Sequence, residues 1–406
     1  MSLIVQKYGG SSLADSDKIK NVAERVIKKY KEGNQVIVVA SAMGDTTDNL
    51  IEQMEEITEN PDPRERDMLL CTGEQISIAL LSMALQKEGV PAISLTGSQV
   101  KIKTDDTYNR AEILQIDDSR IKKELAEEKI VVVAGFQGVN SRNDYTTLGR
   151  GGSDTTAVAL ACALEAERCE IYSDVEGIFT ADPRIVNKAQ KLKSISYEEM
   201  LELANLGANV LHPRSVELAK YFGLELYLAS SFNYKPGTIV KEVEKMEDRN
   251  NVTGVTSDCD VVKITVEGVP DKPGMAGKLF SRLAEKGINV DMIIQNLQHN
   301  NKNDITFTIC EADLQKCCSV LDKISDSISA DKIETDQDVA KVSIVGAGMI
   351  STPGIAAKMF ATLGQEEINI QKITTSDIKI SCLIKENSAN RAVKAIHDSF
   401  ELESIS

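Results

Sequence analysis

Short apolar runs and longer amphipathic segments alternate along the first 235 residues of the chain. The apolar runs are rich in Val, Ile and Leu, and they predict strands at 2–7, 35–41, 92–96, 130–135, 170–173 and 225–228. Between them, apolar residues recur every three or four positions and predict helices at 16–31, 74–88, 117–127, 154–165, 197–204 and 213–222. Such alternation is typical of a mostly parallel sheet covered by helices on both faces. We therefore expect a layered α/β domain here.

A different pattern begins after a charged stretch. The segment KPGTIVKEVEKMEDRNN (235–251) combines a turn signal with dense charge and little apolar periodicity, so it predicts a domain boundary. Beyond it, 262–290 and 342–370 align without a gap, with Pro273-Gly274 matching Pro353-Gly354 and Ile288-Asn289 matching Ile368-Asn369. A fixed offset of about 80 residues indicates two copies of one unit.

Each copy has the pattern of a small mixed module. A strand, a Pro-Gly turn, an amphipathic helix and a second strand are followed by another strand and helix, at 304–310 and 314–324 in the first copy and at 379–384 and 389–400 in the second. This order favours a ferredoxin-like βαββαβ module. We expect four parts: a first domain at 1–240, a linker at 241–260, and modules at 261–339 and 340–406.

Composition narrows the class of protein. The net charge of −16 and the pI near 4.9 disfavour nucleic acid and membrane surfaces as partners. No run of 18 apolar residues predicts a membrane span, and the N-terminus lacks the basic region of a signal peptide. Eight cysteines without CxxC pairs and three widely separated histidines predict reduced thiols, no metal site and a cytoplasmic location.

The first strand ends in a loop suited to phosphate. LIVQKYGGSSL places Lys7, Gly9 and Gly10 at its carboxyl end, where open α/β sheets bind ligands. Glycines let backbone N–H groups approach phosphate oxygens, and a lysine supplies positive charge. A plain turn explains the same residues, and GxxxxGK[ST] occurs nowhere in the chain. The run SIVGAGMIS starts like a dinucleotide motif but has Ser351 at the third glycine position, so no redox cofactor is expected.

The stretch TTLGRGGSDTTA carries the stronger signal. Arg150 is able to grip a carboxylate through two hydrogen bonds, and Ser153 and Asp154 follow where a helix begins. As an alternative, Ser153 is an N-cap and Asp154 complements the helix dipole. A cap alone does not require Arg-Gly-Gly, so we favour a binding site.

Three further loops carry polar groups at strand or helix ends. SAMGDTTDNL contributes Ser41 and Thr47, TGEQIS contributes Glu74, and YSDVEGIFTADPR leaves another strand. Capping explains the first two, and the third is either a nucleotide-binding loop or a long connection. All of these loops are expected at one edge of the sheet, where anionic and cationic groups would meet.

Taken together, KYGGSS, SAMGDTTDNL, TGEQIS, GRGGSDTTA, SDVEGIFTADPR and GANVLHPR resemble the aspartokinase family over nearly the whole chain. That family combines an amino-acid kinase fold with two C-terminal ACT modules. The resemblance implies transfer of the γ-phosphoryl group of Mg-ATP to the β-carboxylate of L-aspartate, the first step of lysine, threonine and methionine biosynthesis.

The resemblance also implies roles for individual residues. Arg150 would hold the substrate α-carboxylate, Glu74 with Asp154 the ammonium group, and Lys7 the transferring phosphoryl group. The full substrate set is Ser41, Thr47, Glu74, Arg150, Ser153 and Asp154. The ATP set is Lys7, Tyr8, Gly9, Gly10, Ser173, Asp174, Phe179 and Arg184, with Mg²⁺ held mainly by the phosphates.

In the ACT-like modules, the resemblance implies binding of lysine, threonine or both as feedback effectors. Candidate effector residues are Asp271, Ala276, Asn289, Asp291, Gln295, Asn369 and Ile370, although Pro-Gly and Ile-Asn are also ordinary turn chemistry. Module pairing implies a homodimer or larger assembly. A non-catalytic amino-acid sensor and a kinase for another amino acid, such as glutamate, remain alternatives. The sequence leaves open whether Met246 is an internal start for a separate regulatory subunit.

Overall fold

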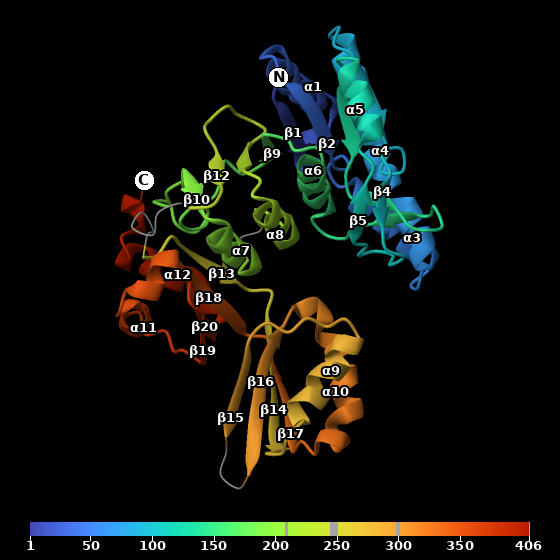
Figure 1. Ribbon diagram of the computed structural model, residues 1–406. Coiled ribbons are helices and arrows are strands. Elements are labelled where there is room, and N and C mark those ends of the chain that lie inside the picture. Colours follow the sequence, from blue (N-terminus) through green and yellow to red (C-terminus); the bar gives the residue numbers. More distant parts are fainter. Residues whose placement is uncertain (208–209, 244–250, 298–300, 406) are drawn as a thin grey trace.

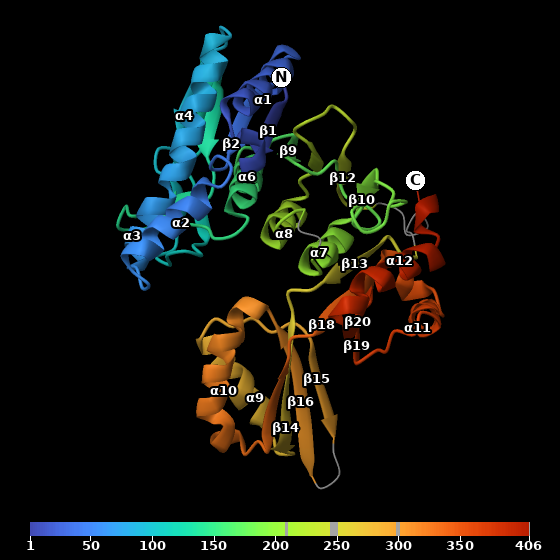
Figure 2. The same ribbon diagram turned by 180° about the vertical axis from the view of Figure 1, so that it is seen from behind.

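A computed structural model describes residues 1–207, 210–243, 251–297 and 301–405. Met246 and Asn209 lie outside the described residues. Figure 1 shows a large N-terminal domain, with the second repeat module beside it near the C-terminus and the first repeat module at the far end. Figure 2 shows the same order from behind: the second module lies against the N-terminal domain, and the first module projects away.

Eight strands form the central sheet, in the order β10-β12-β11-β9-β1-β2-β6-β3. The six strands from β11 to β3 are parallel, and β12 runs antiparallel to β11. Their bounds are β1 Leu3–Tyr8, β2 Gln35–Ala40, β3 Ala92–Leu95, β6 Ile130–Ala134, β9 Arg168–Ser173, β10 Ser194–Ile195, β11 Leu226–Ser230 and β12 Thr238–Val240. The six parallel strands are those that the apolar runs predict.

Helices cover both faces of this sheet because the central strands are apolar on both sides. In β2, Val36 and Val38 pack with α1 and α4, whereas Ile37 and Val39 pack with α5 and α6. The helices of the first face are α1 Ser16–Lys31 and α4 Thr72–Lys87, and those of the second are α5 Ser119–Ala126, α6 Gly152–Ala163, α7 Tyr197–Asn205 and α8 Pro213–Phe222. All six helices were predicted, with small differences at the ends.

A second, four-stranded sheet was not predicted. Its order is β5-β4-β7-β8, with β4 Ile102–Thr104, β5 Ile113–Ile116, β7 Gln137–Val139 and β8 Tyr145–Thr147. These strands have three or four residues, too few for an alternating pattern to be recognised. Helices α2 Thr46–Ile57 and α3 Pro63–Leu70 accompany this sheet, and the buried Asp67 of α3 accepts hydrogen bonds from the backbone and hydroxyl of Thr147, both at 2.8 Å.

The first repeat module has the complete βαββαβ order. It comprises β14 Val262–Pro270, α9 Met275–Glu285, β15 Ile293–Leu297, β16 Lys302–Ile309, α10 Leu314–Ile328 and β17 Lys332–Asp336. The antiparallel sheet has the order β15-β16-β14-β17, and its apolar face packs on α9 and α10 around Phe307. The repeat signal therefore predicts this module correctly.

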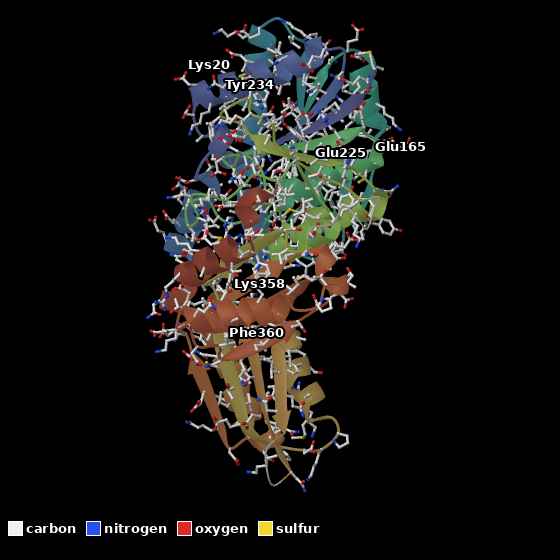
Figure 3. All side chains as sticks on the ribbon, turned by 90° about the vertical axis from the view of Figure 1, so that its left-hand side faces the viewer. Lys20, Glu165, Glu225, Tyr234, Lys358 and Phe360 are labelled. Atoms are coloured by element: carbon white, nitrogen blue, oxygen red, sulfur yellow. The ribbon has the colours of Figure 1, made fainter. Side chains whose placement is uncertain are left out.

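The second repeat module takes its fourth strand from an unexpected place. Its own segment supplies β18 Val339–Val345, α11 Ile355–Gln365, β19 Lys372–Thr375, β20 Lys379–Lys385 and α12 Ala389–Ser399. The strand beside β18 is β13, Gly254–Asp258, which precedes the first module in the chain. The segment 241–260, expected as a linker, thus contains a strand of the second module. On the outer surface of this module, Figure 3 shows Lys358 and Phe360 on α11.

The two modules contact each other through equivalent positions. Residues 291 and 371 match in the repeat alignment, and each meets a lysine of the other module: Asp291 pairs with Lys341, and Gln371 accepts a hydrogen bond from Lys263. Lys341 is almost fully buried in β18, so its charge requires this partner and Asp258, 3.5 Å away.

The second module docks on the first domain through a buried carboxylate. Glu199 of α7 accepts hydrogen bonds from the backbone and hydroxyl of Ser196, forming a capping box. The same carboxylate accepts from the hydroxyl of Thr253 at 2.6 Å and from the backbone N–H of Ala347, in the second module, at 3.0 Å. Nearby, Glu202 pairs with Lys379 at 2.9 Å.

The helical stretch Pro63–Lys87, formed by α3 and α4, is long and apolar enough to cross a membrane by length and composition alone. Half of its most apolar window is buried inside the fold, and its α4 part packs on α1 and the central sheet. These contacts are typical of a core helix in a globular domain.

Replacing Glu199 with alanine should strip four donors of their acceptor and lower the free energy of unfolding by about 3 kcal/mol. The neighbouring Glu198 pairs with Lys220 at the surface, so Glu198→Ala should cost about 1 kcal/mol or less. Urea unfolding of the two variants tests this, with amide hydrogen exchange at Ala347 as a local probe. Equal effects of the two substitutions would contradict the assigned role of Glu199.

Candidate active site

The site lies at the carboxyl end of β1, where the strand order reverses. β1 lies between β2, the next strand of the sheet along the chain, and β9, which the chain reaches later through α6, and this is the position where open α/β sheets bind ligands. A cavity of about 290 Å³ opens there. It is lined by all seven predicted catalytic and substrate-binding residues, namely Lys7, Ser41, Thr47, Glu74, Arg150, Ser153 and Asp154, together with Gly10, Ala42, Gly44, Phe136, Gly149, Gly151 and Gly152.

Lys7 and Asp154 form an ion pair at the floor of this cavity. Lys7 Nζ lies 2.6 Å from Asp154 Oδ1, and both side chains are about nine-tenths buried. Lys7 is on β1, and Asp154 is in the first turn of α6, so the pair joins the central sheet to the helix that follows the GRGG loop. The lysine charge is thereby held at the point where the GG loop begins.

Glu74 provides an unpaired negative group. It lies in the first turn of α4 and is 3% exposed; Oε1 accepts the backbone N–H of Ala42 at 3.2 Å, whereas Oε2 is buried and has no partner. Burial raises the pKa of Glu74 to about 8, against the hydrogen bonds from its own N–H and that of Ala42. A buried carboxylate oxygen facing a cavity is suited to a cationic ligand group.

Arg150 provides the positive group at the rim. The side chain of Arg150 is exposed and lines the cavity. The next residue, Gly151, is the N-cap of α6 and has a φ of 69°, in the left-handed region. A Cβ on Gly151 would lie 2.3 Å from Cβ and Cγ of His212, so only glycine fits there. The same steric limit explains why glycine occupies position 10: a Cβ on Gly10 would lie 2.8 Å from the carbonyl oxygen of Ala42.

The residues predicted to bind ATP do not all lie together in the structure. Gly9 donates its N–H to the carbonyl of Tyr172, so the GG loop and the loop that begins with Ser173 and Asp174 are neighbours at the sheet edge. Phe179 lies further along that loop; its side chain is half-buried, and its backbone forms an isolated antiparallel β-bridge with Lys191. Arg184 is 89% exposed and forms a two-pronged ion pair with Asp182. It does not line the cavity.

Tyr8 does not face the site. Its side chain is fully buried, stacks on Tyr172 with ring centroids 5.0 Å apart, and donates its hydroxyl to Gln6 at 3.2 Å. The strand alternates its side chains between the two faces, and the residue after Lys7 therefore points into the helical layer rather than the crevice. The backbone carbonyl of Tyr8 reaches the edge, where it accepts the N–H of Ser41, so a contribution of Tyr8 to the ATP site through its backbone stays a prediction.

A second cavity, of about 320 Å³, lies in the first repeat module between the β14–α9 turn and the sheet. Three of the predicted effector residues, Asp271, Ala276 and Gln295, line it. So does Asn303, which was not predicted and whose amide donates to Asp271 Oδ1 at 3.0 Å. Asn303 lies on β16, and no local sequence signal distinguishes it from the other residues of that strand.

The other four predicted effector residues do not line this cavity. Asn289 and Asn369 are exposed, Ile370 packs on the core of the second module, and Asp291 pairs with Lys341. Among these four residues, Asp291 contributes to the contact between the two modules.

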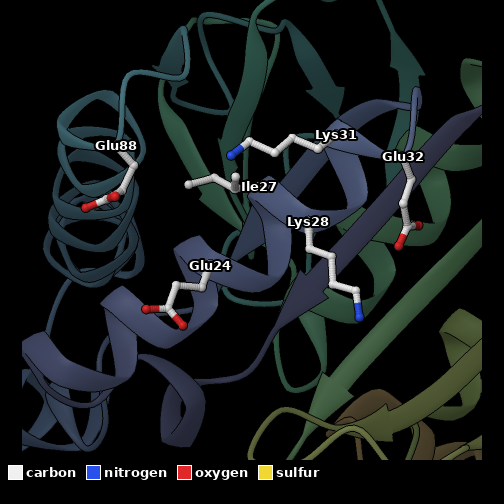
Figure 4. A pocket seen from close by; sticks show the side chains of 6 residues that line it. All are labelled: Glu24, Ile27, Lys28, Lys31, Glu32 and Glu88. Carbon is white, nitrogen blue, oxygen red and sulfur yellow. The ribbon is translucent and has the colours of Figure 1, made fainter.

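A further cavity, of about 530 Å³, lies elsewhere. It is lined by Glu24, Ile27, Lys28, Lys31, Glu32 and Glu88, at the ends of α1 and α4 away from the carboxyl ends of the strands (Figure 4). Its charged side chains have both signs and stand on exposed helix ends. It therefore lacks the buried, convergent polar groups that typify a binding site.

Comparison with known proteins gives these features a family. Residues 2–230 match the amino acid kinase family, and residues 262–324 and 342–400 match the ACT domain. The chain is 50% identical over 402 residues to an aspartokinase of Bacillus sp. (strain MGA3), covering 99% of this chain and 98% of that protein. The chain belongs to the aspartokinase family. It is also 48% identical over 402 residues to aspartokinase 2 of Bacillus subtilis (strain 168), with the same coverage.

A solved structure of an aspartokinase has the same architecture. The crystal structure of Escherichia coli aspartokinase III in complex with aspartate and ADP matches with a TM-score of 0.83 and 25% sequence identity, covering 98% of this chain and 99% of that one. The predicted fold class, an amino-acid kinase domain with a mostly parallel sheet followed by two ferredoxin-like ACT modules, is confirmed.

Proposed function

We propose that this aspartokinase-family protein transfers the γ-phosphoryl group of ATP to the β-carboxylate of L-aspartate, giving 4-phospho-L-aspartate and ADP. The observation that carries the proposal is the pairing, in one cavity, of a buried carboxylate oxygen without a partner and an exposed arginine. An α-amino acid carries an ammonium group and a carboxylate on one carbon, and these two groups match Glu74 and Arg150. The E. coli structure crystallised with aspartate and ADP supports the choice of substrate.

In this proposal, the remaining residues orient and neutralise charge. Ser41, Thr47 and Ser153 hydrogen-bond the substrate, and Lys7 stabilises the charge on the transferring phosphoryl group while Asp154 holds the lysine in place. Gly9 and Gly10 approach the phosphates, and Ser173, Asp174, Phe179 and Arg184 contact the rest of the nucleotide. Arg184 would have to leave Asp182, or bind nucleotide together with it.

The chemical step requires no strong base. A side-chain carboxylate with a pKa of about 3.9 is already ionised at neutral pH, so its oxygen attacks the γ-phosphorus directly while the bond to the β,γ-bridging oxygen breaks and ADP leaves. Catalysis then rests on positioning and charge stabilisation. In this proposal, Mg²⁺ arrives with ATP as part of the substrate.

Regulation is the second part of the proposal. The cavity beside Asp271 is a candidate site for L-lysine, L-threonine or both, acting as feedback inhibitors in a homodimer or larger assembly. The E. coli aspartokinase III structure in complex with lysine and aspartate, with a TM-score of 0.77 and 25% identity, supports an amino-acid effector. We infer that the carboxylate of Asp271 receives the effector ammonium group.

The primary test is ADP release from Mg-ATP with L-aspartate or L-glutamate, with hydroxylamine to trap the acyl phosphate. We expect turnover with aspartate, and a loss of about 100-fold in kcat/KM in Arg150→Ala, because a paired carboxylate contact is removed. Arg142→Ala, an exposed arginine of the β7–β8 turn, is the matched control. Turnover with glutamate alone would change the substrate, and amino-acid binding without turnover would indicate a sensor.

The pKa of Glu74 predicts a pH dependence. Only the ionised carboxylate binds an ammonium group, and with a pKa of about 8 the ionised fraction falls about tenfold per unit below pH 8. The kcat/KM for aspartate should therefore rise between pH 6 and pH 8, since this parameter reports the free enzyme. In Glu74→Gln the rise should disappear along with most of the activity. A flat wild-type profile would contradict the role of Glu74.

Inhibition should depend on Asp271. Inhibition curves measured with L-lysine, L-threonine and an equimolar mixture should name the effector, and Asp271→Ala should raise the half-inhibitory concentration about tenfold or more, as expected for loss of a charged hydrogen bond. Asp322→Ala, on the exposed face of α10, provides the control. Unchanged inhibition in Asp271→Ala would move the effector site elsewhere.

A further inference from the structure

The segment Leu211–Arg214, with the sequence LHPR, has no role in the function proposed above, yet it lies against the loop that carries Arg150. It forms a rigid start to α8: His212 is the N-cap residue, and its carbonyl accepts the N–H and the hydroxyl of Ser215 at 3.0 and 2.7 Å. Pro213 occupies the first helical position, where its fixed φ suits a helix start.

Arg214 binds the backbone just before the GRGG loop and the segment beside it. Its Nη1 donates to the carbonyl oxygen of Leu148 at 3.2 Å, and its Nη2 donates to that of Ala111 at 3.0 Å. Leu148 is buried and stands two residues before Arg150, and Ala111 donates its own N–H to Thr147. The guanidinium therefore ties the entry of the loop to the strand region beside it, with two donors in a fixed geometry.

His212 limits the other side of the loop. Its ring is in such close contact with Gly151 that no Cβ fits between them. Burial lowers the pKa of His212 below its usual value, so the ring is neutral at pH 7, although Asp154 opposes this shift. A neutral ring adds no charge to the site, and it acts here through its shape.

Arg150 itself has no such support. Within the described residues, no hydrogen bond or ion pair to its side chain is present, and the side chain is exposed. Its direction is thus set by the backbone from Leu148 to Gly151, and that backbone is fixed by Arg214 at one end and by His212 at the other.

We propose that Arg214 and His212 are positioning residues for substrate binding: they hold the GRGG loop so that Arg150 meets the α-carboxylate of the amino acid. This inference rests on the proposed function. According to this inference, part of the affinity for the amino acid comes from the N-terminus of α8, outside the cavity. Affinity for ATP should not change, because Lys7, Gly9 and Gly10 belong to other loops.

The test is steady-state kinetics of the full-length enzyme with Arg214→Met, Arg214→Lys and His212→Ala. Arg214→Met should raise KM for aspartate about tenfold, the effect of losing one or two hydrogen bonds to a positioned loop, with KM for ATP unchanged. Arg214→Lys should show a smaller increase, because an ammonium group reproduces one of the two bonds. His212→Ala should act in the same direction. Lys220→Met, which also removes a cation from α8, is the matched control.

A double-substitution cycle separates positioning from general destabilisation. If Arg214 acts through Arg150, adding Arg214→Met to Arg150→Ala should cause no further loss in kcat/KM for aspartate. Additive losses, or equal increases in KM for ATP and for aspartate, would overturn the inference. Wild-type enzyme without aspartate turnover would overturn both this inference and the proposed function, whereas an active wild type with an unaffected Arg214→Met variant would overturn the inference alone.

Discussion

The burial of the Glu74 carboxylate is the constraint on which the site depends. One oxygen receives the N–H of Ala42 and the other has no partner, so the ionised group is costly until a cation arrives. Lys7 does not neutralise it, because Lys7 is already paired with Asp154. The cavity therefore contains one ion pair and two groups without a partner, Glu74 and Arg150, and the ammonium and carboxylate groups of an α-amino acid match these two.

The sheet topology produces this separation. β1 is the strand at which the order reverses, so the loops after β1, β2 and β6 and the first turns of α4 and α6 converge on one crevice. Where loops converge so closely, the backbone of one loop must come into contact with the backbone or a side-chain ring of another. Gly10 against Ala42 and Gly151 against His212 are the two positions where this requirement is most severe. The glycines are thus consequences of the packing as much as features of ligand binding.

The docking of the second ACT module reaches the loop that follows β9. The carbonyl oxygen of Thr180 in this loop accepts the N–H of Val255 on β13 at 2.8 Å, and the hydroxyl of Thr180 contacts His397 of α12 at 3.0 Å. Phe179 and Arg184 belong to the same loop. Because β13 is also an edge strand of the second module, backbone hydrogen bonds and buried side chains connect that module to the first domain.

The sequence by itself indicated the six parallel strands, the principal helices, the tandem repeat and seven of the residues that line the cavity. Those features follow from local periodicity and from loops placed at strand ends, which a single segment expresses on its own. Only the tertiary structure decided that β13 completes the second module, that Tyr8 points into the core, and that Asp291 pairs with Lys341. Each of these depends on which distant segment is adjacent, and strand pairing and burial between distant segments leave no periodic signal in the chain.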